Sequence, residues 1–240
     1  MHSFYLAEQI SGDAALISDA GQLHHLRDVL RLRIGDEVIV FDDGGNKYSG
    51  TIEGLDNKRA VLRLRARQPA PIRRLRLAVA CAVPKQARMD DIIDKLTQLG
   101  ADSIFPMFTE RVIVKPEGTT DARLERWRKI ALSASEQSHR NTLPFVSPVT
   151  GLKEVLANSK DYQLKLVPTL VGQRQALREL FTDSSPDSVF VLIGPEGDFT
   201  PEEIQEAMDA GFIPVSLGDA VLRVETAAIA VASYIKLAFG

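Results

Sequence analysis

The fold is decided by the stretch VFVLIGPEGDFTPEE, which covers residues 189–203. Its first five residues are all apolar, as in a strand that is buried on both faces of a parallel sheet. The glycines that follow allow a tight turn. After the turn, Thr200, Pro201 and Glu203 have the spacing of a helix N-terminus with a capping box. The stretch therefore predicts a buried strand, a turn and a helix.

The same alternation extends in both directions along the chain. Strands are predicted over residues 75–83, 103–107, 164–168, 188–193 and 213–216, and helices over 89–99, 121–138, 173–181, 201–210 and 226–239. Apolar strands that alternate with helices form a parallel sheet covered on both faces. We therefore expect an α/β domain here.

The N-terminal part of the chain has a different pattern. Residues 37–65 form short alternating runs separated by turn residues, which predicts a small antiparallel β-domain. Residues 22–32 have a helical apolar spacing that is closed by Gly35. The stretch Gln68-Pro69-Ala70-Pro71 disfavours both helix and sheet, so it is interpreted as a linker. We expect one domain over residues 1–70 and a second over 71–240.

Composition narrows the class of protein. With 240 residues, 45% of them hydrophobic and 25% charged, the chain can form one large globular domain or two modest ones. Its single cysteine excludes an internal disulfide framework and suits a reducing compartment. No secretory signal pattern is present, and the apolar stretch 226–239 is too short for a membrane span. We expect a cytoplasmic protein that does not bind membranes.

The net charge of -3 is spread unevenly. Residues 58–76 form a basic stripe without any acidic residue: Lys58, Arg59, Arg63, Arg65, Arg67, Arg73, Arg74 and Arg76. Such a stripe is typical of a surface that binds a phosphate backbone. A solvated strand face followed by a linker explains it equally well. The end of the helix predicted over 121–138 is also open to two interpretations, either an ordinary helix C-terminus or a surface for phosphates and base edges.

Three loops form the candidate site, because ligands of open parallel sheets bind at the carboxyl ends of strands. They cover residues 193–199, 216–226 and 168–172. The turn at 194–197 has an alternative interpretation as an ordinary connection between strand and helix. Arg223 and Glu225, in the second loop, have an alternative interpretation as a structural ion pair.

Several common motifs for nucleotide binding and catalysis are absent from the sequence. It contains no G-x-x-x-x-G-K-[ST] phosphate loop, no G-x-G-x-x-G after a strand and no G-x-S-x-G elbow. The four histidines have no metal-ligand spacing with Cys81, so we expect no metal site. Cys81 lies in the apolar run LAVACAV, which favours packing over nucleophilic chemistry. Hydrolases and metalloenzymes are therefore disfavoured.

Taken together, these segments resemble the ribosomal small-subunit methyltransferase E family, within the SPOUT class of RNA methyltransferases. The matching residues stand in the family's order along nearly the whole chain: His25-Leu26-Arg27-Asp28-Val29-Leu30-Arg31, Gly35-Asp36, Lys85, Met89, Asp94-Lys95-Leu96, Leu99-Gly100, Glu136-Gln137-Ser138, Arg140, Gly194-Pro195-Glu196-Gly197, Leu217-Gly218, Leu222-Arg223 and Glu225-Thr226-Ala227. Two positions depart from the family pattern. Asp198 stands where a second glycine is usual, and His2-Ser3-Phe4-Tyr5 replaces an arginine-bearing start.

The resemblance implies the fold, the cofactor and the partners. The fold would be α/β, with a SPOUT-type trefoil-knotted parallel sheet domain preceded by a small PUA-like RNA-binding β-barrel, and the chain would work as a homodimer. S-adenosylmethionine would donate a methyl group to N3 of a uridine in 16S rRNA of the assembled small ribosomal subunit. By position, the cofactor would be bound by Leu170, Gly194, Glu196, Gly197, Leu217, Gly218, Leu222 and Thr226. RNA contacts are expected from five arginines of the motifs and the basic stripe: Arg27, Arg31, Arg63, Arg65 and Arg140.

The chemistry would place Arg223 and Glu225 at the reacting centre. Uracil N3 must lose a proton, which requires a base or a stabiliser of the uridine anion. We expect Arg223 to stabilise charge on the uracil carbonyl oxygens and Glu225 to orient Arg223 or accept the proton. Two alternatives stay open at this point. One is a related knotted methyltransferase that acts on transfer RNA or another ribosomal position, and the other is a non-catalytic assembly factor that binds RNA.

Overall fold

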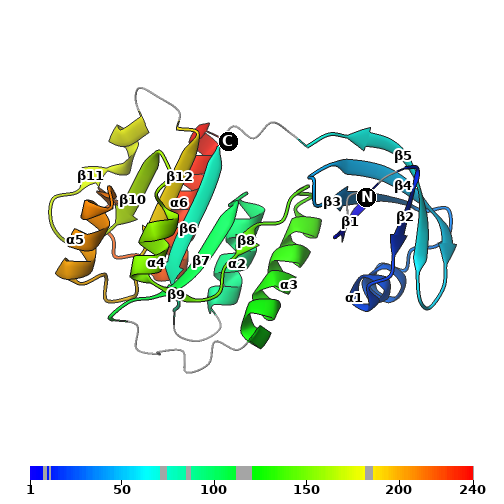
Figure 1. The fold of residues 1–240 in the computed structure, drawn as a ribbon, viewed down its shortest axis with the longest axis horizontal. Coiled ribbons are helices and arrows are strands. Elements are labelled where there is room, and N and C mark those ends of the chain that lie inside the picture. The colour runs from blue at the N-terminus through cyan, green and yellow to red at the C-terminus, as the bar shows by residue number, and fades with distance from the viewer. Residues whose placement is uncertain are drawn as a thin grey trace. The chain divides into compact units, whose positions relative to one another are not determined.

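The chain forms two compact units in the computed structural model, which describes residues 1–7, 10, 12–70, 75–84, 88–111, 121–181 and 186–239 (Figure 1). One unit contains Met1–Ile72 and Leu132–Leu143, and the other contains Arg73–Ala131 and Pro144–Gly240. Four residues named above lie outside the described ranges: Pro71 of the linker, Arg73 and Arg74 of the basic stripe, and Lys85. The predicted division after residue 70 stays a prediction.

The first unit is built on a five-stranded sheet. Its strands are β1 (His2–Leu6), β2 (Ala14–Ile17), β3 (Glu37–Asp42), β4 (Lys47–Leu55) and β5 (Ala60–Gln68), in the order β1-β3-β4-β5-β2. The pairs β3–β4, β4–β5 and β5–β2 are antiparallel, as expected for residues 37–65. The antiparallel pairing predicted for residues 37–65 is confirmed, and β1, which precedes those residues, pairs with β3 in parallel. Strands β1 and β2 were not predicted.

A short helical segment connects β2 to β3. It consists of α1 (Ala20–His24) and the π-helical turn η1 (His25–Val29), in place of the single helix predicted over 22–32. The segment begins early because the Asp19 side chain accepts a hydrogen bond from the backbone N–H of Gln22 at 2.9 Å. It ends early because Arg31 adopts a left-handed φ of 56°, which no helix continues through.

Residues 132–143 complete the first unit from far along the chain. The backbone N–H of Tyr5 donates to Oε1 of Glu136 at 3.0 Å, and Nζ of Lys47 donates to the carbonyl of His139 at 2.9 Å. Nδ2 of Asn141 donates to the carbonyl of Gly45 at 2.8 Å. The segment therefore bonds to β1, to the β3–β4 turn and to the first residue of β4.

The second unit is a parallel sheet with helices. Its strands are β6 (Arg76–Ala82), β7 (Ser103–Phe108), β8 (Phe145–Val146), β9 (Thr150–Gly151), β10 (Leu164–Pro168), β11 (Gln175–Ala176), β12 (Ser188–Ile193) and β13 (Ile213–Ser216). Its helices are α2 (Arg88–Gln98), the part of α3 (Asp121–Gln137) that precedes residue 132, α4 (Leu152–Asn158), the 3-10 helix η2 (Leu177–Phe181), α5 (Pro201–Asp209) and α6 (Val224–Phe239). The strand order is β11-β13-β10-β12-β6-β7-β8, with β9 also paired to β7, and every pair is parallel.

Strand β12 lies near the middle of this sheet and is buried along its whole length. Val189, Val191 and Ile193 belong to a core cluster with apolar residues of α2 and α6. Phe190 and Leu192 belong to a second cluster with residues of α4 and α5. Alternate residues of a strand point to opposite faces, so the sheet is covered on both sides (Figure 1). The α/β architecture predicted from the apolar strands is confirmed.

Other expectations for this unit had mixed outcomes. The helix predicted over 173–181 was wrong, because Gln175–Ala176 pairs with the open edge of β13 and only the short η2 follows. Strands β8 and β9 and helix α4 were not predicted. The packing role of Cys81 is confirmed, since the side chain is fully buried and burial raises the pKa of its thiol well above the usual range.

Candidate functional site

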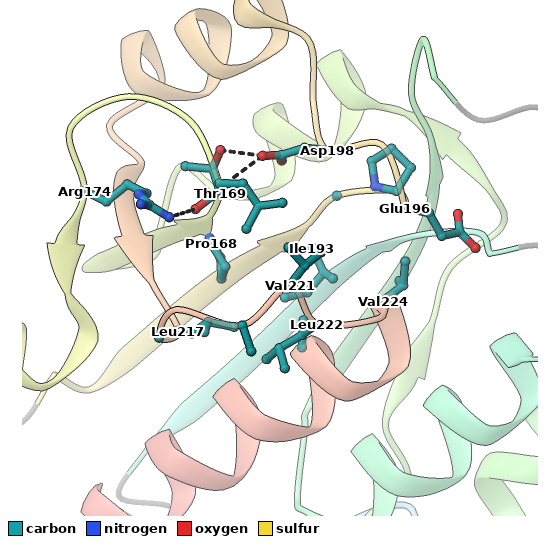
Figure 2. A pocket seen from close by; sticks show the side chains of 16 residues that line it. Pro168, Thr169, Arg174, Ile193, Glu196, Asp198, Leu217, Val221, Leu222 and Val224 are labelled. Atoms are coloured by element: carbon teal, nitrogen blue, oxygen red, sulfur yellow. Dashed lines mark hydrogen bonds between the residues drawn. The ribbon is translucent and has the colours of Figure 1, made fainter.

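A pocket lies at the carboxyl ends of three neighbouring strands, β12, β10 and β13 (Figure 2). The empty space within it, counted together with the solvent-filled mouth, is about 580 Å³. Its walls come from the loops after the three strands and from the first turn of α6: Pro168, Thr169, Leu170, Arg174, Ile193, Gly194, Pro195, Glu196, Asp198, Leu217, Gly218, Ala220, Val221, Leu222, Val224 and Ala227. The three loops singled out in the sequence therefore line one pocket.

Most of the residues expected to bind a cofactor line this pocket. They are Leu170, Gly194, Glu196, Leu217, Gly218 and Leu222. Gly197 and Thr226 are not part of the lining, although each adjoins a lining residue in the chain. Sequence reasoning missed Arg174, because it fell inside a segment interpreted as a helix. The apolar lining residues Ile193, Val221 and Val224 could have been found as direct neighbours of the motifs.

The two glycines of the lining are required for different reasons. A Cβ on Gly194 would lie 2.9 Å from Cδ2 of Phe199, whose ring is buried at 2% exposure. Gly218 has open space around it but a φ of 117°, where residues with a Cβ are strained. The loop after β12 thus needs glycine for packing, and the loop after β13 needs it for backbone conformation.

The loop after β12 is fixed to the helix that follows it. Thr200 Oγ1 accepts a hydrogen bond from the N–H of Glu203 at 3.2 Å, and Glu203 Oε2 accepts one from the N–H of Thr200 at 2.9 Å. Pro201 occupies the first helical position. The predicted capping box is confirmed. Glu203 Oε1 also accepts a hydrogen bond from the N–H of Glu110 at 2.8 Å, which ties α5 to the segment after β7.

Asp198 joins two of the pocket loops. Its Oδ2 accepts hydrogen bonds from Oγ1 of Thr169 at 2.8 Å and from the N–H of Leu170 at 2.7 Å, while its Oδ1 accepts one from the N–H of Phe199 at 2.8 Å (Figure 2). The backbone of Asp198 has a φ of 59°, a region that Asp tolerates better than most residues. The residue that departs from the resembled pattern therefore forms part of the pocket wall.

Arg223 and Glu225 flank the pocket at the start of α6. They alternate with Leu222 and Val224, which line it. Within the described residues, the exposed Arg223 side chain makes no hydrogen bond or ion pair, and none joins it to Glu225. The interpretation of the two as a mutual ion pair was therefore wrong. Oε2 of Glu225 is shielded from solvent and accepts no hydrogen bond from the described part of the chain.

Arg88 bridges the loop after β12 and the first turn of α6. Its Nη1 lies 3.7 Å from Oε1 of Glu196, and its Nε lies 3.9 Å from Oε1 of Glu225. Arg88 begins α2, so a third element holds the carboxylates of the loop after β12 and of helix α6. Nothing in the sequence pattern pointed to this residue, because the contacts join positions more than one hundred residues apart.

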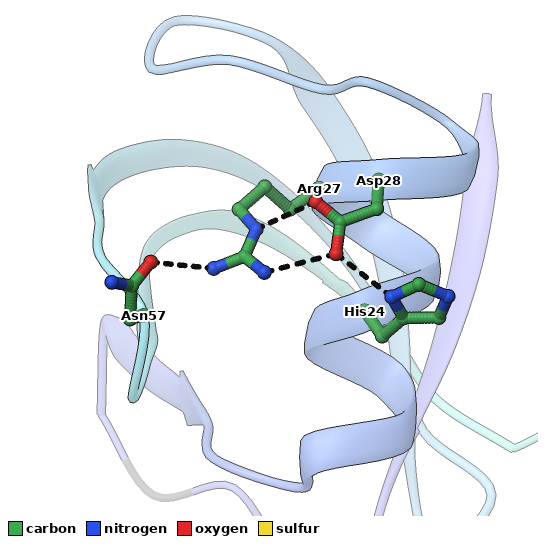
Figure 3. Close-up of polar contacts among 4 residues, drawn as sticks. All are labelled: His24, Arg27, Asp28 and Asn57. Carbon is green, nitrogen blue, oxygen red and sulfur yellow. Dashed lines mark hydrogen bonds and ion pairs between the residues drawn. The ribbon is translucent and has the colours of Figure 1, made fainter.

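The two arginines expected to bind RNA in and just after η1, Arg27 and Arg31, are arranged differently from one another. Nε and Nη2 of Arg27 donate to the two carboxylate oxygens of Asp28 at 2.8 and 2.9 Å, and its Nη1 donates to Oδ1 of Asn57 at 2.6 Å (Figure 3). Hydrogen bonds from Arg27 and then from His24 hold the pKa of Asp28 at about 2. Arg31 is exposed, and its side chain has no hydrogen-bond or ion-pair partner among the described residues.

The basic stripe lies partly on β5, where its members face acidic neighbours. Nε of Arg63 donates to Oε1 of Glu53 at 2.5 Å, and Nη1 of Arg65 lies 3.8 Å from Oε1 of Glu37. Both arginines are exposed. Arg140 is half-buried and follows the end of α3. The positive charge of the stripe is thus partly balanced within the sheet itself.

Comparison with known proteins decides the family. Residues 71–236 match the model of the RNA methyltransferase domain, and residues 17–65 match that of the RNA methyltransferase PUA domain. The chain belongs to the RNA methyltransferase family. This methyltransferase is 35% identical over 222 residues to the ribosomal RNA small subunit methyltransferase E of Synechocystis sp., covering 90% of the chain and 70% of that protein. It is 28% identical over 230 residues to the enzyme of the same name from Bacillus subtilis, covering 92% of the chain and 90% of that protein.

A solved structure supports the same assignment. The ribosomal RNA small subunit methyltransferase E of Neisseria gonorrhoeae, crystallised with bound S-adenosyl methionine, superposes with a TM-score of 0.89 at 31% identity, over 100% of this chain and 98% of that one. The resemblance stated from the motifs is therefore confirmed, and the N-terminal unit of this methyltransferase contains a PUA domain.

Two further observations concern membranes and metals. Across the described ranges, no helix of this methyltransferase is both long and apolar enough to cross a membrane. The same residues contain no group of three or more His, Cys, Asp or Glu side chains that could hold a metal ion.

Proposed function

We propose that this methyltransferase transfers the methyl group of S-adenosylmethionine to N3 of a uridine in 16S rRNA of the assembled small ribosomal subunit, in the cytoplasm. The observation that carries the proposal is the meeting of three loops around one pocket, beside which Oε2 of Glu225 is buried without a hydrogen-bond partner among the described residues. The names of the relatives support a small-subunit rRNA substrate.

The pocket residues fit the proposed cofactor. Apolar side chains such as Ile193, Leu217 and Leu222 suit an adenine ring, and the loop backbones offer hydrogen-bonding groups. When bound, the cofactor supplies an electrophilic methyl group on a sulfonium. The contacts proposed are those of the eight residues named from the sequence.

The remaining chemistry falls to Arg223 and Glu225. A buried acceptor without a donor costs free energy, and a donor brought by a bound ligand removes that cost. The N3–H of uracil is such a donor, so Glu225 would accept its proton. The exposed guanidinium of Arg223, which has no partner among the described residues, would stabilise the charge that then develops on the uracil carbonyl oxygens. The target base must leave any stack to reach these groups.

Single-turnover methylation of small subunits from a deletion strain tests the proposal. Glu225→Gln and Arg223→Ala should each reduce the rate about 100-fold or more, as the loss of a catalytic acid–base or charge-stabilising group does. Glu202→Gln is the matched control, because Glu202 also lies in the first turn of a helix but is exposed on α5. It should react at the native rate.

Mass spectrometry of the 16S rRNA and calorimetry complete the test. The expected product is one methyl at N3 of one uridine. A methyl on transfer RNA or on another ribosomal position would replace the proposed substrate with that one. A chain that binds small subunits but shows no affinity for S-adenosylmethionine would be a non-catalytic assembly factor. Near-native rates in both variants would remove Arg223 and Glu225 from the chemistry.

We further propose the arrangement that the resemblance implies for the whole protein. Residues 1–70 would bind RNA with Arg27, Arg31, Arg63 and Arg65, joined by Arg140, and residues 71–240 would carry the catalytic domain. The catalytic domain would be knotted at its C-terminal loops. In support, the consecutive strands β12 and β13 lie on opposite sides of β10. The chain would act as a homodimer, which sedimentation equilibrium measures directly.

A further inference from the structure

The carboxylate of Asp198 accepts hydrogen bonds from residues that are distant in the sequence. Its bonds to Thr169 and Leu170 cross 29 and 28 residues and connect the loop after β12 to the loop after β10. These two strands are direct neighbours in the sheet. The two hydrogen bonds that Asp198 accepts therefore fix the separation of two walls of the pocket.

Apolar packing contributes little to holding the loop after β10. Leu170 is 48% exposed and Val171 is 56% exposed, so neither side chain anchors the segment in the core. The segment is held by polar contacts instead. Thr169 Oγ1, which donates to Asp198, also accepts a hydrogen bond from the N–H of Val171 at 3.2 Å. Arg174 Nη1 donates to the carbonyl of Thr169 at 3.1 Å (Figure 2).

Asp198 is central to these contacts and is itself buried, with 9% of its surface exposed. Hydrogen bonds to a charged acceptor are stronger than those between neutral groups. Without the carboxylate, the N–H of Leu170 would have no partner in the described chain and the Thr169 hydroxyl would lose its acceptor. The backbone at a φ of 59° would be relaxed with glycine, so the side chain is present despite a conformational cost.

We propose that Asp198 is a positioning residue for the pocket. Its carboxylate holds Thr169 and Leu170 against the loop after β12 and so fixes the position of a pocket wall on which ligand affinity depends. We call this pair of hydrogen bonds the latch. The inference rests on the proposed function in taking S-adenosylmethionine as the ligand. The carboxylate acts through the position of Leu170 and not through its charge on the ligand. Affinity for the cationic cofactor and for its uncharged-sulfur product should therefore depend on it equally.

The experiment compares Asp198→Gly with the native chain. Glycine suits the left-handed backbone, so the variant removes the latch without adding strain. Calorimetry measures the affinities for S-adenosylmethionine and S-adenosylhomocysteine, and hydrogen exchange measures the protection of the Leu170 amide. The matched control is Asp56→Gly, because Asp56 also accepts hydrogen bonds from two backbone N–H groups, those of Lys58 and Arg59, but within a turn of the other unit.

Asp198→Gly should lower both affinities by about tenfold, which corresponds to about 1.4 kcal/mol, and should speed exchange at Leu170 by a similar factor. The control should leave both ligand affinities and Leu170 exchange unchanged. Unchanged affinities in a folded Asp198→Gly chain would overturn the proposal, and so would a loss confined to the sulfonium. If the native chain bound neither ligand, the proposed function would fail, while exchange at Leu170 would still decide whether the latch exists.

Discussion

Alanine at position 194 should destabilise the second unit through a single steric clash. The new Cβ would lie 2.9 Å from Cδ2 and 3.0 Å from Cε2 of Phe199, whereas carbon atoms in contact normally stay about 3.5–4.0 Å apart. The ring is buried in the core, so it cannot swing into solvent. Overpacking of this kind costs about 1–3 kcal/mol. Loss of the glycine's freedom in the unfolded chain returns about 0.4–1 kcal/mol.

We therefore expect Gly194→Ala to lower the free energy of unfolding by about 1 kcal/mol, the difference between the midpoints of these two ranges. Denaturant unfolding with the slope held common measures the change, and calorimetry with S-adenosylmethionine shows whether the displaced loop also weakens binding. Gly197→Ala is the control from the same turn. Its Cβ would lie 3.6 Å from Cδ of Arg111, an ordinary contact, and its backbone is outside the left-handed region.

The control should be as stable as the native protein or up to about 1 kcal/mol more stable. The reasoning is refuted if Gly194→Ala unfolds at the native denaturant concentration, because Phe199 would then have room to move. It is also refuted if both variants lose the same stability, because a general requirement for glycine in the turn would explain that result.

Three further predictions concern other parts of the molecule. Thr200→Ala should cost about 1 kcal/mol of unfolding free energy by removing half of the capping box, as measured in urea, and Thr200→Ser should restore it. Arg88→Met should cost about 1 kcal/mol or less, because the two ion pairs are partly exposed, and a double-mutant cycle with Glu225→Gln should show coupling; complete additivity would contradict the bridge. Burial raises the pKa of the Glu136 carboxyl above its unfolded value of 4.5. The folded state therefore binds the proton more tightly than the unfolded state, and the stability that this gives is present at low pH and is lost as pH rises through the folded pKa. Glu136→Gln should flatten that decline in pH-dependent unfolding, and an unchanged slope would show that another group causes it.

The parts of the fold that depend on local patterns were accessible from the sequence. The strand β12 and the N-terminus of α5 at Thr200 are each determined by residues a few positions apart, so the sequence predicted both with their boundaries. Pairing between distant segments was not accessible. The parallel pairing of β1 with β3 and the pairing of Gln175–Ala176 with β13 depend on which sheet edge is open once the fold has formed.

The candidate site shows the same division. Its three loops follow from the rule that ligands bind at the carboxyl ends of parallel strands, and the pocket lies there. The cross-loop contacts could not be predicted, because the partners of Arg88 and Asp198 are set by tertiary structure. A charge count along the basic stripe also could not show that Arg63 and Arg65 lie near carboxylates on β4 and β3.

The segment 132–143 has a consequence for how the nascent chain folds. Its bonds to Tyr5, Lys47 and Gly45 complete a unit whose other residues are made first. About 60 residues of the second unit separate the two parts, and ribosomes add about 5–20 residues per second. The N-terminal sheet is therefore synthesised several seconds before residues 132–143, which complete its unit. A fragment that ended at residue 70 would lack this segment altogether.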